Sequence, residues 1–253
     1  VIEGVRIKLA SRCGISPDLS EAINSRALLH IDNAYYLSDI SVENYLCKTN
    51  TSSSTAFRGF GGNQGMMIIE NIVDNIAGYL KKDPAKIRKI NFYQKNKKNI
   101  THYGMKIEDN VTNEIYSKLI KSSNYKNRKL NIKKFNLKNK YLKKGLSFTP
   151  VKFGISFTTR HLNQAGALVH IYCADGSVHV STGAIEMGQG TYTKIAMLIS
   201  NELGLPFNKI KVFSTCTDKV PNTSASAASS TTDLNGAAAI NAVNKIKQNL
   251  ALF

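Results

Sequence analysis

The 253-residue sequence contains no apolar run that approaches the roughly 18 residues a membrane-spanning helix needs. An integral membrane protein of the helical class is therefore excluded. Its four cysteines are also too scattered for a metal centre, since none forms a C-x-x-C pair and none lies near a histidine at zinc-finger spacing. We expect no structural zinc or iron–sulfur cluster within this chain, and free thiols in a reducing compartment.

Acidic residues are scarce in one region only. The chain carries a net charge of +17, yet residues 81–145 hold 20 Lys+Arg against 4 Asp+Glu, and the rest of the chain is nearly balanced. Because the charge is local, the composition does not indicate a nucleic-acid binder along the whole chain. Hydrophobic residues make up 42% and charged residues 20%, so the chain can bury a core and wholesale disorder is excluded.

The two ends of the sequence resemble the interiors of secondary-structure elements. There is no initiator methionine, the first residues (VIEGVRIKL) have the pattern of a strand, and the last (KIKQNLALF) lie inside a helical pattern. We therefore expect a fragment of a longer chain, and no signal or transit peptide is visible.

Composition divides the sequence into three parts: residues 1–94, a basic Lys/Asn-rich connector over 95–145 with little periodicity, and residues 146–253. In the first part the patterns predict a strand over 1–10, a helix over 19–31, short extended pieces at 35–37 and 42–46, and a helix over 66–80. Asp83-Pro84 predicts a capped start for one more helix.

The last part begins with a predicted strand around 151–158. Alternating segments at 167–172 and 177–182 predict a hairpin, followed by a helix that ends at Gly204, a strand over 210–214 and a final helix after 233. Together these elements predict an α+β fold with mixed and antiparallel sheets, including hairpins, and helices packed on them.

Three loops share one composition. FRGFGGNQG (57–65), GAIEMGQG (183–190) and SASAASSTT (224–232) consist mainly of small residues, and each precedes a predicted helix. Small residues let the backbone approach a ligand, and a helix start offers unpaired N–H groups to an anion. Three such loops predict a large phosphate-bearing or heteroatom-rich cofactor held mainly by backbone. Their spacing matches neither the P-loop nor the Rossmann motif, because Gln64 stands where the last Rossmann glycine would be.

Each candidate residue in these regions also has an ordinary structural interpretation. A glycine-rich turn before a helix is usually only a turn, and Phe60 between two glycines would normally be a core residue. Glu186 just before a helix is more often a cap than a catalytic acid. Arg26, near the end of a predicted helix, would usually stabilise the helix dipole.

Four segments carry a resemblance to a known family: TAFRGFGGNQG (55–65), KFGISFTTRHLNQAGALVHIY (152–172), GAIEMGQGTYTK (183–194) and VPNTSASAASSTTD (220–233). Together they resemble the molybdenum-binding region of the xanthine dehydrogenase and aldehyde oxidase family, over essentially the whole chain. The resemblance is weakest at 1–18 and 95–143. It implies two molybdopterin-binding subdomains with a cofactor cleft between them. Residues 1–94 would be the C-terminal part of the first, and 146–253 the N-terminal part of the second.

The resemblance also implies roles for individual residues. Cofactor contacts fall on Phe57, Arg58, Gly59, Gly188, Gln189, Gly190, Ala228, Ser229, Thr231 and Thr232. Within that set, the backbone of Arg58 and the residue Ala228 would lie near the molybdenum. Substrate contacts fall on Arg26, Phe60, Phe157, Thr158 and Ala227. Asn63 departs from the proline common in relatives, which we expect to loosen one turn.

Arg26 carries the expected substrate preference. It falls on the arginine that pairs with a purine oxygen in xanthine dehydrogenases, where aldehyde oxidases typically have an uncharged residue. The family chemistry implied is hydroxylation of an electron-poor ring carbon, which here would convert hypoxanthine and xanthine to urate. Arg26 would stabilise the negative charge that develops, and Phe60 and Phe157 would orient the flat ring.

The remaining implications concern the full-length protein. The family has two [2Fe–2S] clusters, FAD, and NAD or oxygen as the electron acceptor. It is a homodimer, with a cytoplasmic or peroxisomal location. Its general base is a glutamate in a G-x-G-E-P type segment that this sequence lacks, so we expect the fragment to be catalytically incomplete. The alternatives are an aldehyde oxidase, or a nucleic-acid-binding module built on residues 81–145; we favour a solvated connector there.

Overall fold

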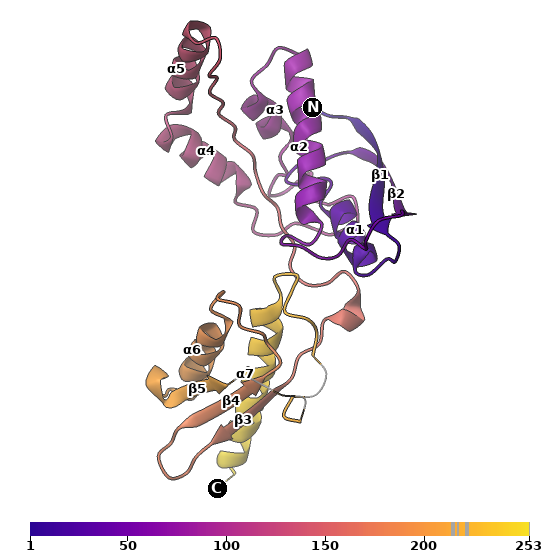
Figure 1. Ribbon diagram of the computed structural model, residues 1–253. Helices are drawn as coiled ribbons and strands as arrows, with labels where there is room; N and C mark the ends of the chain where they lie inside the picture. Colours follow the sequence, from indigo (N-terminus) through magenta and orange to yellow (C-terminus); the bar gives the residue numbers. More distant parts are fainter. Residues whose placement is uncertain (214–215, 217, 221–222, 253) are drawn as a thin grey trace. The chain divides into compact units, whose positions relative to one another are not determined.

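A computed structural model describes residues 1–213, 216, 218–220 and 223–252 (Figure 1). The chain divides into two compact units, Val1–Gly154 and Ile155–Phe253. No helix among the described residues is both long enough and apolar enough to cross a bilayer.

The first unit begins with two strands that pair in parallel. β1 (Gly4–Gly14) and β2 (Asp39–Lys48) lie side by side, and α1 (Ser20–Leu29) connects them. The strand, the helix and the extended piece predicted over these residues are confirmed. The pairing of these two strands, which the sequence left open, is parallel, because a helix between two strands carries the chain back to the end where the first strand began.

Two helices follow as predicted. α2 (Gly62–Tyr79) buries Ile69, Val73 and Ala77 on one face, at the four-residue spacing of a helix. α3 (Pro84–Asn91) starts at Pro84, and the Asp83 carboxylate accepts a hydrogen bond from the Ala85 N–H at 2.8 Å.

The basic region contains two helices where the sequence predicted little regular structure. These are α4 (Thr112–Ser122) and α5 (Tyr125–Lys138). Each buries one tyrosine, Tyr116 and Tyr125, in the same core as Ile69 and Val73 of α2. Part of the Lys/Asn-rich segment therefore belongs to the core of the first unit.

The second unit is a three-stranded sheet covered by two helices. β3 (Ala167–Ile171) and β4 (Val178–Thr182) form the predicted antiparallel hairpin, and β5 (Ile210–Phe213) runs parallel to β4 at the edge. The predicted end of that strand, Ser214, lies outside the described residues. Two short 3-10 helices, η1 (Arg160–Leu162) and η2 (Phe207–Lys209), complete the unit.

α6 (Thr191–Leu203) and α7 (Thr231–Leu250) pack on each other and on the sheet (Figure 1). The fully buried residues of this core are Val178, Val180, Ile195, Ile199, Ala239 and Val243. α6 ends at Gly204, which has a φ of +66° and caps the helix as predicted. The predicted α+β class, with mixed sheets and packed helices, is confirmed.

One predicted strand is wrong. Residues 151–158 form no strand in the structure. Several backbone polar groups in this part of the chain bond to side chains just after α1 and to the 223–232 loop instead of to a neighbouring strand, and Ser156 has a left-handed φ of +74°. An alternating sequence does not show whether a neighbouring strand or side chains will satisfy the backbone.

Candidate functional site

Close packing of α1 against α2 builds the first glycine-rich loop. A Cβ at Gly61 would lie 1.9 Å from the Ile23 carbonyl oxygen, and one at Gly65 would lie 2.2 Å from that of Ala27. Gly61 also has a φ of +93°, a conformation that residues with side chains rarely adopt. Glycine is therefore required at both positions for the two helix backbones to meet.

This packing places the two phenylalanines of the loop in opposite environments. Phe60 is 5% exposed and has a left-handed φ of +48°, whereas Phe57 is 86% exposed. The turn is closed by a bond from the Phe60 N–H to the Phe57 carbonyl at 2.9 Å. The Asn63 side-chain amide also donates to the Arg58 carbonyl at 3.2 Å, so this residue, which we expected to loosen the turn, ties across it.

Arg26 lies in the last turn of α1 and is 1% exposed. The guanidinium carbon lies 5.7 Å from the ring centroid of Phe60 and 5.3 Å from that of Phe153, and Nη1 donates to the Gly154 carbonyl. Burial lowers the pKa of Arg26 from its ordinary value. Two of the predicted substrate residues, Arg26 and Phe60, are thus brought together within the first unit. A buried cation beside aromatic faces can stabilise an electron-rich group strongly.

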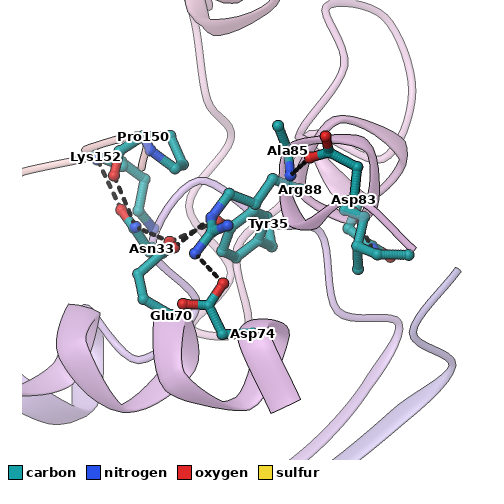
Figure 2. A network of polar contacts seen from close by, with 11 residues as sticks. Asn33, Tyr35, Glu70, Asp74, Asp83, Ala85, Arg88, Pro150 and Lys152 are labelled. Carbon is teal, nitrogen blue, oxygen red and sulfur yellow. Dashed lines mark hydrogen bonds and ion pairs between the residues drawn. The ribbon is translucent and has the colours of Figure 1, made fainter. Parts of the chain in front are cut away.

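Residues 150–154, more than 100 residues away in sequence, are hydrogen-bonded to side chains just after α1. The Asn33 amide donates to the Pro150 carbonyl at 2.9 Å and accepts from the Lys152 N–H at 3.0 Å. The His30 Nε2 accepts from the Gly154 N–H at 2.9 Å. Figure 2 shows Asn33 reaching both Pro150 and Lys152. We call residues 150–154 the strap.

The Asn33 side chain also joins a network on α2 and α3 (Figure 2). One oxygen of Glu70 accepts from the Asn33 amide at 2.8 Å and from the Tyr35 hydroxyl. The other oxygen pairs with Arg88 Nε at 2.7 Å, and Arg88 Nη2 reaches Asp74 at 2.8 Å. This network anchors the residues that hold the strap.

Asp32 is the second anchor of the strap. Its carboxylate is fully buried, pairs with the Lys152 ammonium at 2.5 Å and accepts from the Tyr93 hydroxyl, and the His102 ring lies 3.7 Å away. Burial would raise the pKa of Asp32, but the contacts with His102, Lys152 and Tyr93 outweigh it and hold that pKa below its ordinary value. Asp32 is therefore ionised at neutral pH, while burial lowers the pKa of Lys152 despite its contact with Asp32.

In the second unit, hydrogen bonds join three predicted site segments. The Ser156 N–H donates to the Ala228 carbonyl at 2.9 Å, and the Ile185 N–H donates to the Ser226 hydroxyl at 2.7 Å. Ser224 exchanges two bonds with Gln164. The segment before Phe157, the 183–190 loop and the 223–232 loop therefore form one cluster.

Phe157 is fixed at its backbone by Asn163, six residues later in the chain. The Asn163 side chain accepts from the Phe157 N–H at 2.8 Å and donates to its carbonyl at 2.9 Å. Phe157 is buried, whereas the next residue, Thr158, is exposed. Asn163 was not among the predicted site residues. The sequence marked it only as a polar residue within the segment 152–172, which carries the family resemblance.

The backbone of the 223–232 loop holds an uncommon conformation. Ala228 and Ser229 have φ values of +55° and +56°, so two successive residues with side chains lie in the left-handed region. Ala227 is half-buried, and Thr231 and Thr232 are the first two residues of α7. Strained backbone of this kind is concentrated at functional sites.

The 183–190 loop contains its own anion. The Glu186 carboxylate accepts from the N–H groups of Gly188 at 2.8 Å, Gly190 at 3.0 Å and Tyr192 at 3.1 Å. Glu186 is therefore a cap, and the start of α6 does not offer these groups to a phosphate as the loop composition suggested. The Gln189 amide donates to the Ile185 carbonyl at 2.7 Å and accepts from the Met187 N–H.

The structure brings the predicted residues together in two sets. Arg26, Phe57, Arg58, Gly59 and Phe60 lie in the first unit. Phe157, Thr158, Gly188, Gln189, Gly190, Ala227, Ala228, Ser229, Thr231 and Thr232 lie in the second. The predicted convergence of all three loops on one cofactor stays a prediction, as do the individual roles.

Comparisons with known proteins identify the family of this chain. The molybdopterin cofactor-binding domain family matches residues 1–92 with one of its two domain types and residues 118–253 with the other. Xanthine dehydrogenase/oxidase of Gallus gallus is 45% identical over 249 residues, which are 98% of this chain and 18% of that protein. Xanthine dehydrogenase of Dictyostelium discoideum is 42% identical over 97% of this chain and 18% of its own length.

The fold has counterparts among solved structures. Quinoline 2-oxidoreductase from Pseudomonas putida 86 matches 94% of this chain and 32% of its own with a TM-score of 0.79 and 21% identity. CO dehydrogenase from Oligotropha carboxidovorans matches 98% of this chain and 33% of its own with a TM-score of 0.76 and 21% identity. The chain spans under a fifth of the length of its curated relatives, and it belongs to the molybdopterin cofactor-binding domain family.

Proposed function

We propose that this chain is part of a xanthine dehydrogenase-like molybdenum hydroxylase that converts hypoxanthine and xanthine to urate. The identity of 41–45% to several xanthine dehydrogenases over most of the chain supports this proposal. The observation that carries the purine assignment is the buried Arg26 guanidinium beside the Phe60 ring. A purine has ring oxygens that can pair with this cation, whereas a simple aldehyde has no group at that position.

The 183–190 loop leaves open space beside two of its glycines, which supports a cofactor site there. Gly188 and Gly190 have φ values of +92° and +77°, and no described atom outside their chain neighbours lies within 4 Å of where a Cβ would stand at either position. The loop therefore needs these glycines for its conformation and leaves their outer side open. Their N–H groups bond to Glu186, so a pterin would contact the open side of the two glycines, beside the exposed Ser229 of the same cluster.

Bound molybdopterin would supply the two-electron oxidation and the oxygen transfer to the purine ring. The residues of this chain would bind and orient the reactants. We assign Phe57, Arg58 and Gly59 to the cofactor in the first unit, with the Arg58 backbone near the metal. In the second unit we assign it Gly188, Gln189, Gly190, Ala228, Ser229, Thr231 and Thr232.

Arg26 would hold a purine oxygen and stabilise the negative charge that builds up on it during attack at the ring carbon. The rings of Phe60 and Phe157 would contact the flat heterocycle, while Thr158 and Ala227 would face the substrate. In the full-length protein the electrons would pass to iron–sulfur clusters, FAD and then NAD or oxygen, and we expect a homodimer.

The direct test is analysis of the full-length protein. We expect equimolar amounts of molybdenum, of pterin (detected as its fluorescent oxidised form) and of protein chain. We also expect the protein to form urate from xanthine. Cofactor without xanthine oxidation but with aldehyde oxidation would favour the aldehyde oxidase alternative. Protein that contains neither molybdenum nor pterin when expressed in a cofactor-producing host would contradict the proposal.

A further inference from the structure

The His30 side chain closes a ring of contacts around Arg26. Its Nδ1 bonds to the Arg26 carbonyl at 2.9 Å, and its Nε2 bonds to the Gly154 N–H at 2.9 Å. The Gly154 carbonyl in turn accepts from the Arg26 guanidinium. The backbone and the side chain of Arg26 are therefore linked through the same two residues, His30 and Gly154.

This ring of contacts requires a neutral imidazole. Nδ1 must carry the proton to donate to a carbonyl, and Nε2 must be bare to accept from an amide. Burial, followed by the positive charges of Arg26 and Lys152, lowers the pKa of His30, and the opposing contributions of the Arg26 carbonyl and Asp32 are outweighed. One tautomer thus fits both bonds, which fixes the orientation of the ring.

The strap cannot easily move away from this ring of contacts. Lys152, two residues before Gly154, is held by the buried Asp32 carboxylate and by the Asn33 side chain. Phe153 packs so closely that a Cβ at Gly62 would lie 2.7 Å from its ring, and the His30 ring centroid lies 5.2 Å from that of Phe153. Gly154 is therefore a rigid support for the guanidinium.

We propose that His30 is a positioning residue for substrate choice, which acts by holding Gly154 where it fixes the direction of the Arg26 guanidinium. This inference rests on the proposed function, in which Arg26 binds the purine oxygen. His30 itself makes no contact with substrate in this scheme. Its loss should therefore reduce purine oxidation selectively, whereas a merely structural residue would reduce all activities together.

The test compares kcat/KM for xanthine and for an aromatic aldehyde in the full-length protein with its molybdenum content measured. His30→Phe keeps the ring and removes both bonds. We expect the xanthine-to-aldehyde ratio to fall about ten- to a hundredfold, because misplacing a reacting group by about 1 Å costs up to that order. His30→Gln, whose carbonyl can still accept from Gly154, should recover most of the ratio.

Two comparisons separate positioning from folding. His179→Phe is the control, because His179 is a half-buried histidine of β4 that contacts Tyr172 and Phe213 in the second unit and has no described bond to the strap. This control should leave the ratio unchanged. Hydrogen exchange should show lost protection at the Gly154 amide in His30→Phe and retained protection in the control.

A double variant decides whether His30 acts through Arg26. In an Arg26→Met background, His30→Phe should no longer change the ratio. Two results would contradict the positioning role even if Arg26→Met alone lowers the ratio. In the first, His30→Phe leaves the xanthine-to-aldehyde ratio unchanged. In the second, His30→Phe lowers the ratio equally in the protein with Arg26 and in the Arg26→Met protein. If Arg26→Met alone changes nothing, the proposed function fails first and the inference with it. Should His30→Phe not fold, His30→Asn, which is too short to reach Gly154, carries the same test.

Discussion

Arg26 and Arg88 are equally buried, but the structure holds them in different ways. Arg88 pairs with the carboxylates of Glu70 and Asp74, so its charge is balanced within the first unit. Arg26 instead lies beside the rings of Phe60 and Phe153 and bonds to a backbone carbonyl. The first arrangement stabilises a fold, and the second is suited to an electron-rich ligand.

Replacement of Arg88 should therefore lower stability. In Arg88→Met the carboxylate of Glu70, whose side chain is 13% exposed, loses its buried cation. Breaking a buried pair in this way costs about 3–5 kcal/mol in the free energy of unfolding. Asp74 lies at the other end of the same network, and its side chain is 51% exposed. Asp74→Asn should therefore lower the free energy of unfolding by about 1 kcal/mol or less. Urea unfolding of the 253-residue chain, followed by circular dichroism, measures both; equal losses would contradict the account.

Sequence reasoning identified some site residues and missed others for a physical reason. Arg26 and Phe60 stand in recognisable motifs, and local patterns predicted the helices that carry them. His30, Asp32 and Asn33 were not identified, because their partners on the strap lie 117–124 residues away. The available signal was the segment H-I-D-N, with three polar residues in four, directly after a predicted helix, where solvent exposure would be the ordinary expectation.

At the scale of elements, the start of α6 shows how a loop can be organised by its own side chain. Backbone N–H groups of Tyr192, Gly190 and Gly188 lower the pKa of Glu186 below its ordinary value. A depressed carboxyl pKa means that the folded state is favoured by the ionised form. This contribution is present above the ordinary glutamate pKa, and it is lost as the pH falls through the lower pKa of the folded state.

Glu186→Gln should consequently show a pH-dependent loss of stability. We expect a lower Tm than the unmodified chain near neutral pH, and a difference that narrows as the pH falls below about 4.3. Glu202→Gln is the control on the same helix, because Glu202 forms an exposed pair with Lys247 and should change little. Thermal unfolding across a pH series checks this, and a Tm difference that does not vary with pH would exclude the carboxylate as the cause.

The Gln189 amide spans the same loop and should affect cofactor retention. In the full-length protein, Gln189→Ala removes bonds to Ile185 and Met187 that are each worth about 0.5–1.5 kcal/mol net. We expect reduced molybdenum and pterin content. Gln248→Ala, an exposed glutamine late in α7, should leave both unchanged. Unaltered metal content and activity in Gln189→Ala would remove this residue from the site.

Most elements with clear periodicity were predicted correctly. α2 and α6 were recognised from their apolar faces, and α3 from its Asp83-Pro84 start. α5 was missed because lysine and asparagine make up most of it, whereas α4 was missed although its isoleucines, leucine and tyrosine recur at helical spacing inside the basic segment. The strap was predicted as a strand because an extended backbone has the same sequence pattern whether strands or side chains satisfy it.

At the scale of the whole molecule, the structural units and the family matches divide the chain at different places. The first unit ends at Gly154, whereas the second family match begins at residue 118, so it includes α5 and the strap of the first unit. The basic segment adds Tyr116 and Tyr125 to the first unit, which gives it a structural role besides the solvated connector we expected. The division at 94 and 145 stays a prediction from composition.

Substrate choice by Arg26 is the central claim, and it is tested in the full-length protein. Xanthine carries ring oxygens and accumulates negative charge as its ring carbon is attacked, so a cation at its far end lowers the barrier. A simple aromatic aldehyde has no group there. Loss of one preorganised charge-stabilising group costs about 2.7–4 kcal/mol, which is roughly a hundred- to a thousandfold in rate.

The most direct measurement is therefore kcat/KM of Arg26→Met for xanthine and for an aromatic aldehyde, on protein with normal molybdenum content. We predict that the xanthine-to-aldehyde ratio falls by about a hundred- to a thousandfold, because only the purine uses the guanidinium. If Arg26 only stabilises its helix, both activities will fall together with protein stability. An unchanged ratio would contradict the account.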